Sequence, residues 1–212
     1  MSNKLYTVFL LSLAFLSCAE KDIKMQNTDY NLRGKVKQVN TISYSGDTTG
    51  DSSKKKKIAL FDKVGNLTQE TSYRSDGITA DYKKVYTYNQ NKNEGEMKMF
   101  KGDEVESLTI IKYDKNGYLQ ESIRTSLEDS KKDKTVYKNN NIGQLIEITP
   151  EDGDKQVLEY DNKGDLIQST SFVLGIIKCQ IKEYDKVGNW KKAFFLYKGE
   201  QYLMERQIEY YE

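Results

Sequence analysis

Histidine is absent from all 212 residues of this chain. Its absence excludes Ser-His-Asp and Cys-His catalysis, histidine general bases and most zinc or copper sites. Cysteine is scarce, with Cys18 and Cys179 alone. If Cys18 is acylated, Cys179 has no partner for an intramolecular disulfide. Cys179 lies in the strand-like stretch Ile176–Ile181, which favours a buried structural thiol over a reactive one.

An excess of either charge is also missing. The chain has 33 basic and 32 acidic residues, and removal of residues 1–17 takes away Lys4 and no acid. No basic surplus then remains to neutralise phosphates, so nucleic acid is not an expected partner. We predict no cofactor and no metal. The remaining 195 residues are the size of one ordinary domain.

Long apolar runs are limited to one, Leu5–Leu16, near the start. It follows Lys4 and is shorter than the roughly 20 residues that a spanning helix needs. Ser17-Cys18 then resembles a lipoprotein cleavage site, and the alternative is an ordinary signal peptide with an incidental cysteine. We therefore expect a signal peptide at 1–17, lipid on Cys18, a linker at 18–30 and one domain at 31–212. Two or more acyl chains would anchor it stably to the outer membrane, facing the periplasm or the cell surface.

What the sequence does have is tyrosine, with 16 residues, and an internal repeat. An aromatic residue, Asp, two variable residues, Gly, one more residue and an apolar residue recur in order. The copies are Phe61–Leu67, Tyr113–Leu119, Tyr160–Leu166 and Tyr184–Trp190, with a degenerate copy at Asn139–Leu145. A further copy is expected around Gly95, with a short insertion.

The repeat predicts β-hairpins. Asp can accept backbone hydrogen bonds in a turn and Gly can supply a positive φ, while the flanking stretches are rich in β-branched, aliphatic and aromatic residues. Proline occurs once, at Pro150 beside a turn, so no proline breaks a predicted strand. We expect an all-β fold: a single antiparallel meander of hairpin repeats that forms an elongated, twisted or curved sheet.

Alternation along the last strands predicts which side chains share a face. Ile177, Cys179 and Ile181 fall together. In the next strand Trp190 falls with Lys192, Phe194 and Leu196, opposite to Ala193 and Phe195. The last strand has one further set, which consists of Tyr202, Met204, Arg206, Ile208 and Tyr210.

At these residues the sequence resembles the YD-repeat (RHS-type) proteins, and most of all small bacterial lipoproteins built from a few such repeats. The opening segment Leu32–Val39 and the closing segments Gly188–Lys192 and Arg206–Tyr211 support the narrower match. The resemblance covers roughly residues 31 to 212 and implies architecture rather than activity. Large RHS proteins form a shell around a toxin, and this chain has too few repeats for that.

Acidic residues suggest two candidate metal sites. Asp62, Asp114, Asp161 and Asp185 could form a calcium ladder, but one Asp per turn favours turn capping. The turn Glu151–Asp154 is the densest acidic group and the second candidate.

Two further groups could form a binding surface. Tyr82, Tyr86, Tyr88, Trp190 and Tyr197 could make an aromatic platform for sugar or peptide, although rings stacked across strands are also an ordinary core. The basic run Lys54–Lys57 follows the polar stretch 47–53. It is typical of a solvated loop end or of an edge strand protected from aggregation, with contact to an anionic glycan or lipid as the alternative.

Three functions follow as hypotheses. The first is a non-enzymatic, membrane-anchored binding or scaffold module that offers an extended sheet surface to a protein or glycan. The second is an immunity or antitoxin-type protein that binds a toxin, which the resemblance alone motivates. The third, ranked last, is a hydrolase with paired carboxylates. The ligand and the oligomeric state are not specified by the sequence.

Overall fold

The computed structural model describes residue 30 and residues 32–45 and 53–212. Within them lie fourteen strands and one short 3-10 helix. The strands are β1 Val36–Ser45, β2 Ser53–Phe61, β3 Leu67–Tyr73, β4 Ala80–Asn89, β5 Glu94–Lys101, β6 Glu104–Tyr113, β7 Leu119–Ser126, β8 Lys132–Asn139, β9 Leu145–Pro150, β10 Gln156–Tyr160, β11 Leu166–Ser171, β12 Gly175–Tyr184, β13 Trp190–Tyr197 and β14 Glu200–Tyr210, and the helix is η1 Gln90–Lys92. Among the described residues, no helix is long and apolar enough to cross a membrane.

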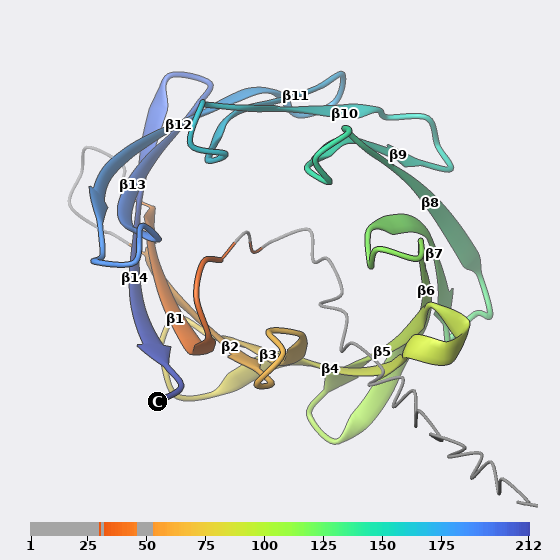
Figure 1. Ribbon diagram of the computed structural model, residues 1–212. Helices are drawn as coiled ribbons and strands as arrows, with labels where there is room; N and C mark the ends of the chain where they lie inside the picture. Colours follow the sequence, from red (N-terminus) through yellow and green to blue (C-terminus); the bar gives the residue numbers. More distant parts are fainter. Residues whose placement is uncertain (1–29, 31, 46–52) are drawn as a thin grey trace, which may run out of the picture.

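The strands form a closed barrel. Each strand pairs antiparallel with the strands before and after it, and β1 also pairs with β14 from Val36↔Tyr210 to Ser45↔Tyr202. Figure 1 shows the ring, with the first and last strands side by side. The predicted antiparallel meander is therefore confirmed, but the predicted elongated, open sheet is wrong, because the sheet closes on itself.

Closure also changes the place of the lysine run Lys54–Lys57. The run lies inside β2, which pairs with β1 on one side and β3 on the other. Lys54 and Lys55 are exposed and pair with β1 alone, whereas Lys56 and Lys57 have partners in both β1 and β3, so the predicted loop end or edge strand is wrong for these two. Alternation then turns Lys57 inward, opposite Thr41 and Ser72, while Lys56 lies over the ring of Tyr73.

The repeated turns have one geometry. In the first, the Asp62 side chain accepts hydrogen bonds from the amides of Val64, Gly65 and Asn66 at 2.8–3.0 Å. The same kind of capping is made by Asp114, Asp161, Asp185 and, in the degenerate copy, Asn140. The turn interpretation of these aspartates is confirmed, and no group that could hold a metal ion lies among the described residues.

The copy expected around Gly95 is not a turn of this kind. The chain instead reverses just before Gly95, through η1 at Gln90–Lys92. Asn93, which follows η1, takes the left-handed conformation with φ 51°. Gly95 lies within β5, opposite Tyr88, where a Cβ would lie 3.2 Å from the ring of Tyr113. The glycine is therefore explained by close packing of rings, which a search for turn residues cannot separate from a positive φ.

Every repeated turn is followed by a β-bulge. In the last copy, Glu183 pairs with Lys192 but Tyr184 pairs with Trp190, so Lys191 has no opposite partner. The bulge shifts the alternation, and Trp190 lies inside the barrel with Phe195 rather than with Lys192. The predicted grouping of Trp190 was wrong for this reason.

Successive turns pack against one another at one end of the barrel. A Cβ added to Gly143 would lie 2.1 Å from Cζ of Tyr118, which belongs to the preceding turn. A Cβ on Gly164 would lie 3.1 Å from Nε2 of Gln144 in the turn before it. Tyr118 and Gln144 each directly follow the turn glycine of their own copy. In these copies the residue after the turn glycine therefore covers the glycine of the next repeated turn. The turns in contact form a connected rim.

The segment before β1 completes that rim. Arg33 donates a hydrogen bond to the carbonyl of Gly188 and, at 2.5 Å, to that of Lys163. The Asn189 side chain accepts from the amide of Arg33 at 2.7 Å and donates to its carbonyl at 2.8 Å. The opening and closing segments are thus clamped to the last two repeated turns.

Two tyrosines near the C-terminus strengthen the clamp. The hydroxyl of Tyr210 accepts a hydrogen bond from the side-chain amide of Asn189 at 2.8 Å and donates one to the carboxylate of Asp185. The hydroxyl of Tyr211 donates to the carbonyl of Phe61 at 2.6 Å, and its amide donates to the carbonyl of Lys35 at 2.8 Å. Side chains from both ends of the domain therefore fix the β1–β14 junction.

The apolar core fills only part of the interior. One cluster joins Tyr30 and Leu32 to inward residues of β1–β3, including Val39, Phe61 and Leu67. A second cluster consists of Ile111, Tyr113 and Leu119, with Tyr86, Tyr88, Met97 and Tyr137 packed against it. Both clusters are thus centred on β1–β7, whereas much of the inner wall from β8 to β14 lines a cavity.

Rim packing makes one glycine more sensitive to substitution than another glycine of similar φ. Gly143 has φ +80° and Gly153 has φ +85°, but no atom lies within 4 Å of a Cβ at Gly153. Both changes to alanine carry the left-handed cost of roughly 1–2 kcal/mol. We expect Gly143→Ala to lower the free energy of unfolding by about 1–3 kcal/mol more, since Tyr118 must move. Equal losses for the two variants in urea unfolding would contradict the packing role.

The clamp also predicts acid sensitivity. Burial by itself raises the pKa of Asp185, but hydrogen bonds from Tyr210 and from the amides of Asn189, Val187 and Gly188 outweigh it and hold the pKa below 3.8. A lowered folded-state pKa adds stability that is present above about pH 4 and is lost as the pH falls through the folded value.

We therefore expect the urea concentration at the unfolding midpoint of the native chain to decrease as the pH is lowered below 4. The Asp185→Asn variant should show a smaller decrease. Tyr210→Phe, which keeps the carboxylate but removes one donor, should lie between them. Identical pH profiles for the native chain and Asp185→Asn would contradict the assignment.

Candidate binding cavity

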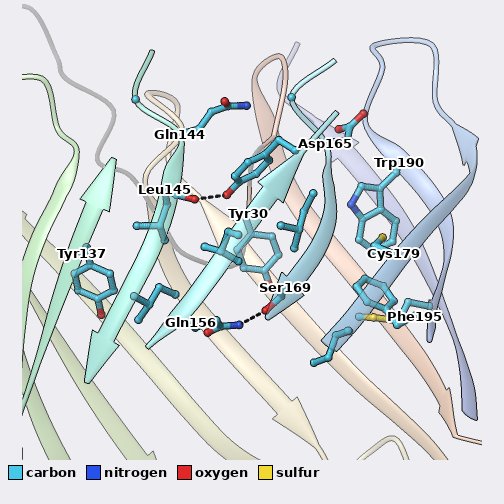
Figure 2. Close-up of a pocket in the computed structure, with 18 of the residues that line it drawn as sticks. Tyr30, Tyr137, Gln144, Leu145, Gln156, Asp165, Ser169, Cys179, Trp190 and Phe195 are labelled. Carbon is cyan, nitrogen blue, oxygen red and sulfur yellow. Dashed lines mark hydrogen bonds between the residues drawn. The ribbon is translucent and has the colours of Figure 1, made fainter. Parts of the chain in front are cut away.

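The open part of the interior is a cavity of about 860 Å³. Its lining comes from inward positions of β8 to β14, from Thr41 of β1 and Lys57 of β2, from Tyr30, and from three repeated turns. Figure 2 shows these side chains directed into one space enclosed by strands. A volume of this order is typical of sites for small organic molecules.

Aliphatic side chains make much of the wall. Ile148, Leu158, Ile177 and Met204 each occupy an inward position of a different strand. Ser169, opposite Leu158 and Ile177, is a small residue between two large ones. This part of the wall is therefore largely apolar, and Ser169 contributes a short side chain between larger ones.

An aromatic and cationic stack forms one side. The rings of Trp190 and Phe195 lie 6.3 Å apart at 60°, and the guanidinium of Arg206 lies 3.5 Å from the centre of the Trp190 ring. The same guanidinium lies 5.6 Å from the centre of Tyr30. Arg206 is 9% exposed, so the cation–π contacts are largely desolvated and stronger than surface ones.

A buried carboxylate lies across the lumen from β8–β12. The side chain of Glu70 is 4% exposed and lies 3.1 Å from Nζ of Lys57 and 3.2 Å from Nζ of Lys84. The Tyr30 hydroxyl donates to it at 3.1 Å, and Lys57 lies 5.5 Å from the Tyr30 ring. Two ammonium groups and a hydroxyl compensate the buried charge, which otherwise would carry a large desolvation cost.

A second buried carboxylate, Asp165, belongs to the rim. It lies 3.4 Å from Arg33 and accepts a hydrogen bond from the hydroxyl of Tyr184 at 3.1 Å. Asp165 is the residue that follows the turn glycine in its copy of the repeat, and it lines the cavity. Its charge is therefore compensated by the clamp that closes the barrel.

Neutral hydrogen bonds hold the β9–β11 part of the wall. Nε2 of Gln156 donates to Oγ of Ser169 at 2.6 Å, and the Tyr160 hydroxyl donates to the carbonyl of Leu145 at 2.6 Å (Figure 2). β9 and β10 pair through only two register positions. The bond from Tyr160 to Leu145 therefore joins these two strands where the ladder is short.

Cys179 faces the cavity from β12, opposite Phe195 (Figure 2). It is a free cysteine, and burial raises the pKa of its thiol to about 11, while Asp165 adds a smaller increase and Arg206 opposes it. The thiolate that would act as a nucleophile is therefore scarce at neutral pH.

The structure does not bring the predicted aromatic platform together. Tyr86 and Tyr88 pack in the core clusters, and Trp190 lies in the cavity. The acidic turn has capping roles: Asp152 accepts from the amide of Asp154 at 3.1 Å, and Glu151 from that of Lys134. Cys18, the predicted lipid attachment site, lies outside the described residues.

Sequence reasoning missed Glu70, Lys57, Tyr30 and Asp165 as parts of one interior. Two of them carried a usable signal, since Glu70 and Lys57 stand at strand positions that share a face with apolar residues such as Ala59 and Val39. Tyr30 was assigned to the linker, but it is buried against Phe61 at a ring distance of 5.4 Å. Its place in the lumen depends on barrel closure, which no local pattern indicates.

The position of Cys179 predicts slow thiol labelling. At pH 8 a thiol of pKa about 11 is roughly one thousandth ionised, so we expect a neutral maleimide to react orders of magnitude more slowly than with a thiol of pKa 8.5. Unfolding in urea should restore fast labelling, and the Cys18→Ser variant would isolate the signal. Rapid labelling of that folded variant would contradict burial in the cavity.

Comparison with known proteins shows the fold alone. No protein-family model matches this sequence, and no curated protein matches it either. Among solved structures, the chain is similar to a porin-like protein from Bacteroides uniformis, with TM-score 0.57 and 10% identity over 84% of this chain and 98% of that one. A LolA superfamily protein from Nitrosomonas europaea matches with TM-score 0.30 and 9% identity, over 85% of this chain and 87% of that one. The first likeness agrees with an all-β barrel, and at these identities neither defines a function.

Proposed function

We propose that this chain is a non-enzymatic binding protein of the cell envelope that holds an elongated amphipathic molecule inside its barrel. The observation that carries the proposal is the cavity of about 860 Å³ on the β8–β14 side of the lumen. Closed antiparallel barrels with such interiors are a recurrent solution for enclosing small apolar ligands.

The lining supports an amphipathic ligand. Aliphatic walls such as Leu158 and Ile177 favour an apolar chain, since burial of apolar surface contributes about 25 cal/mol per Å². Among the described lining residues the charged ones are Lys57, Arg206 and Asp165. Asp165 is paired with Arg33 and Lys57 with Glu70, while the guanidinium of Arg206 stacks on Trp190 at the cavity wall. In the proposal an acidic head group lies beside Arg206.

This interior site replaces the extended sheet surface that the sequence suggested. A closed barrel has no open sheet edges, and its outer wall is a convex surface. The binding role is retained in the proposal, and its place moves to the lumen. No protein or glycan partner is required.

The outer wall supports a location in water beside a membrane. Glu121 lies 3.1 Å from Lys112 and 2.5 Å from Lys134, which makes a charged row across three strands. Lys192 and Glu205 form a similar pair at 3.1 Å on β13 and β14. A wall inserted in lipid would need an apolar band about 25 Å tall. In this proposal the lipid on Cys18, and not a barrel wall inserted in lipid, anchors the protein to the outer membrane.

Hydrolysis by paired carboxylates has less support. Such a site needs two carboxyl groups about 5–9.5 Å apart beside the substrate. Among the described residues that line the cavity, Asp165 is the one carboxylate, and it is engaged by Arg33 and Tyr184. Binding without chemistry is therefore the simpler function for this lining.

Trp190 provides the test, because it is the one tryptophan in the chain and lines the cavity. We expect palmitate to change its emission in a saturable way, and hexadecanol, which lacks the acidic head group, to bind more weakly. Ser169→Phe places a ring in the cavity and should weaken palmitate binding at least about tenfold, or about 1.4 kcal/mol.

The matched control is Thr170→Phe, the next residue of the same strand. Thr170 pairs with Val157 and Ile176 on the outer wall, and it does not line the cavity. This variant should bind palmitate as the native chain does. Near-ultraviolet circular dichroism would establish that both variants are folded. Equal affinity of the two variants, or no saturable response from the native chain to either probe, would contradict a lumenal site for this class of ligand.

A further inference from the structure

An apolar tip projects from the turn between β11 and β12. We define the apolar tip as Phe172, Val173 and Leu174, residues that are 96%, 67% and 46% exposed. Large apolar side chains are scattered singly elsewhere on soluble surfaces, whereas three in succession at a hairpin end mark an interaction site. The exposed fraction of Phe172 shows that this ring has almost no contact with the rest of the chain.

The tip is held in place by polar groups beneath it. The carboxylate of Asp154, from the neighbouring turn, accepts hydrogen bonds from the amides of Phe172 at 3.0 Å and Val173 at 3.1 Å. Oγ of Ser171, which is 7% exposed, accepts from the amide of Leu174 at 2.9 Å. The backbone of the turn is therefore satisfied from below, and the three side chains are left to face outward.

Apolar surface continues from the tip onto the outer wall. Val157 of β10 and Ile176 of β12 flank Thr170 of β11 in register, and they are 39% and 52% exposed. The patch thus extends from the turn across three adjacent strands. It contrasts with the rows of paired lysine and glutamate on β6–β8 and on β13–β14.

The size of the patch distinguishes between kinds of partner. An aromatic side chain buries about 150–250 Å². Even at this area per side chain, the exposed fractions of the three tip residues with Val157 and Ile176 offer less than the roughly 800 Å² that each side of a stable protein interface needs. A lipid bilayer requires no such minimum and no shape complementarity, because its boundary accepts any apolar side chain in proportion to the area buried.

We propose that the apolar tip docks into the surface of a lipid bilayer. Phe, Leu and Val all favour the apolar side of that boundary. The neighbouring turn holds Glu151, Asp152 and Asp154 with one cation, Lys155, so anionic head groups are repelled rather than attracted. The docking is driven by apolar burial, and neutral phosphatidylcholine is the preferred surface.

Docking would orient the barrel. In the β11–β12 hairpin, Ser171 pairs with Gly175 next to the tip, and Ser169 pairs with Ile177 further from it. Both Ser169 and Ile177 line the cavity. The tip is therefore the outer end of a hairpin whose base forms the cavity wall. Bilayer contact by the tip places this end of the barrel, opposite the rim of repeated turns, toward the membrane. The inference does not depend on what the cavity binds.

The test uses the full chain with an indole at the tip. Phe172→Trp in phosphatidylcholine vesicles should show a blue-shifted emission and at least twofold stronger quenching by brominated phosphatidylcholine than the native chain, whose Trp190 sets the background. Lys186→Trp is the matched control, because it places an indole at the opposite end of β12, in the Asp185 turn. All three proteins carry the same N-terminal segment, so attachment through it is equal.

We expect the Lys186→Trp variant to match the native background, and partial replacement of the lipid by phosphatidylglycerol to weaken the Phe172→Trp response. Both substituted side chains are exposed, and unfolding midpoints equal to that of the native chain would confirm the fold. Water-like emission without extra quenching at position 172 would overturn the proposal. So would a blue shift that depends on protein concentration and needs no vesicles, because it would indicate self-association instead.

Discussion

Backbone pairing between β1 and β14 is the constraint on which the rest of this structure depends. All the other strand pairs join neighbours along the chain, so short turns suffice to form them. The β1–β14 ladder alone brings together residues from the two ends of the domain, from Val36 with Tyr210 to Ser45 with Tyr202. Such a long-range pairing carries the largest loop-closure cost, which further side-chain contacts help to offset.

The clamp supplies that stabilisation. The side chain of Asn189 exchanges two hydrogen bonds with the backbone of Arg33. Tyr210, at the end of β14, contacts Asn189, and Tyr211, which follows it, contacts Phe61 at the end of β2. These residues, apart from Phe61, come from the opening segment Leu32–Val39 and from the closing segments Gly188–Lys192 and Arg206–Tyr211. The structure therefore gives a physical reason for those end segments in this chain: they hold the first and last strands of the ring together.

The local structure could be predicted from the sequence, but the closure could not. Asp-x-x-Gly determines each repeated turn because a carboxylate at the first position satisfies two or three amides of the same turn, and Asn140 does the same in the degenerate copy. This information is local. It is equally compatible with an open sheet and with a ring, which is why the elongated sheet was predicted.

Two smaller errors have the same origin. The regular alternation of a strand fails at a bulge, so Trp190 was assigned to the wrong face although its own strand was identified. Gly95 was assigned to a turn because glycine is common in turns. Here it is present because the rings of Tyr88 and Tyr113 lie close to its backbone, and the sequence does not distinguish these two roles. The cavity residues were missed as a group because Tyr30, Lys57 and Arg206 meet only once the first and last strands are neighbours.

The uneven filling of the lumen then follows from the side chains that the repeat places inside. On the β1–β7 side the inward positions hold rings and branched chains, such as Phe61, Tyr113 and Leu119, and these pack into two buried clusters. On the other side, positions of the same kind hold Ser169 and Cys179. A barrel of this circumference has more interior than its side chains fill unless rings occupy most inward positions. The short side chains of Ser169 and Cys179 thus contribute to the cavity on one wall, while the two buried clusters pack the other side of the lumen.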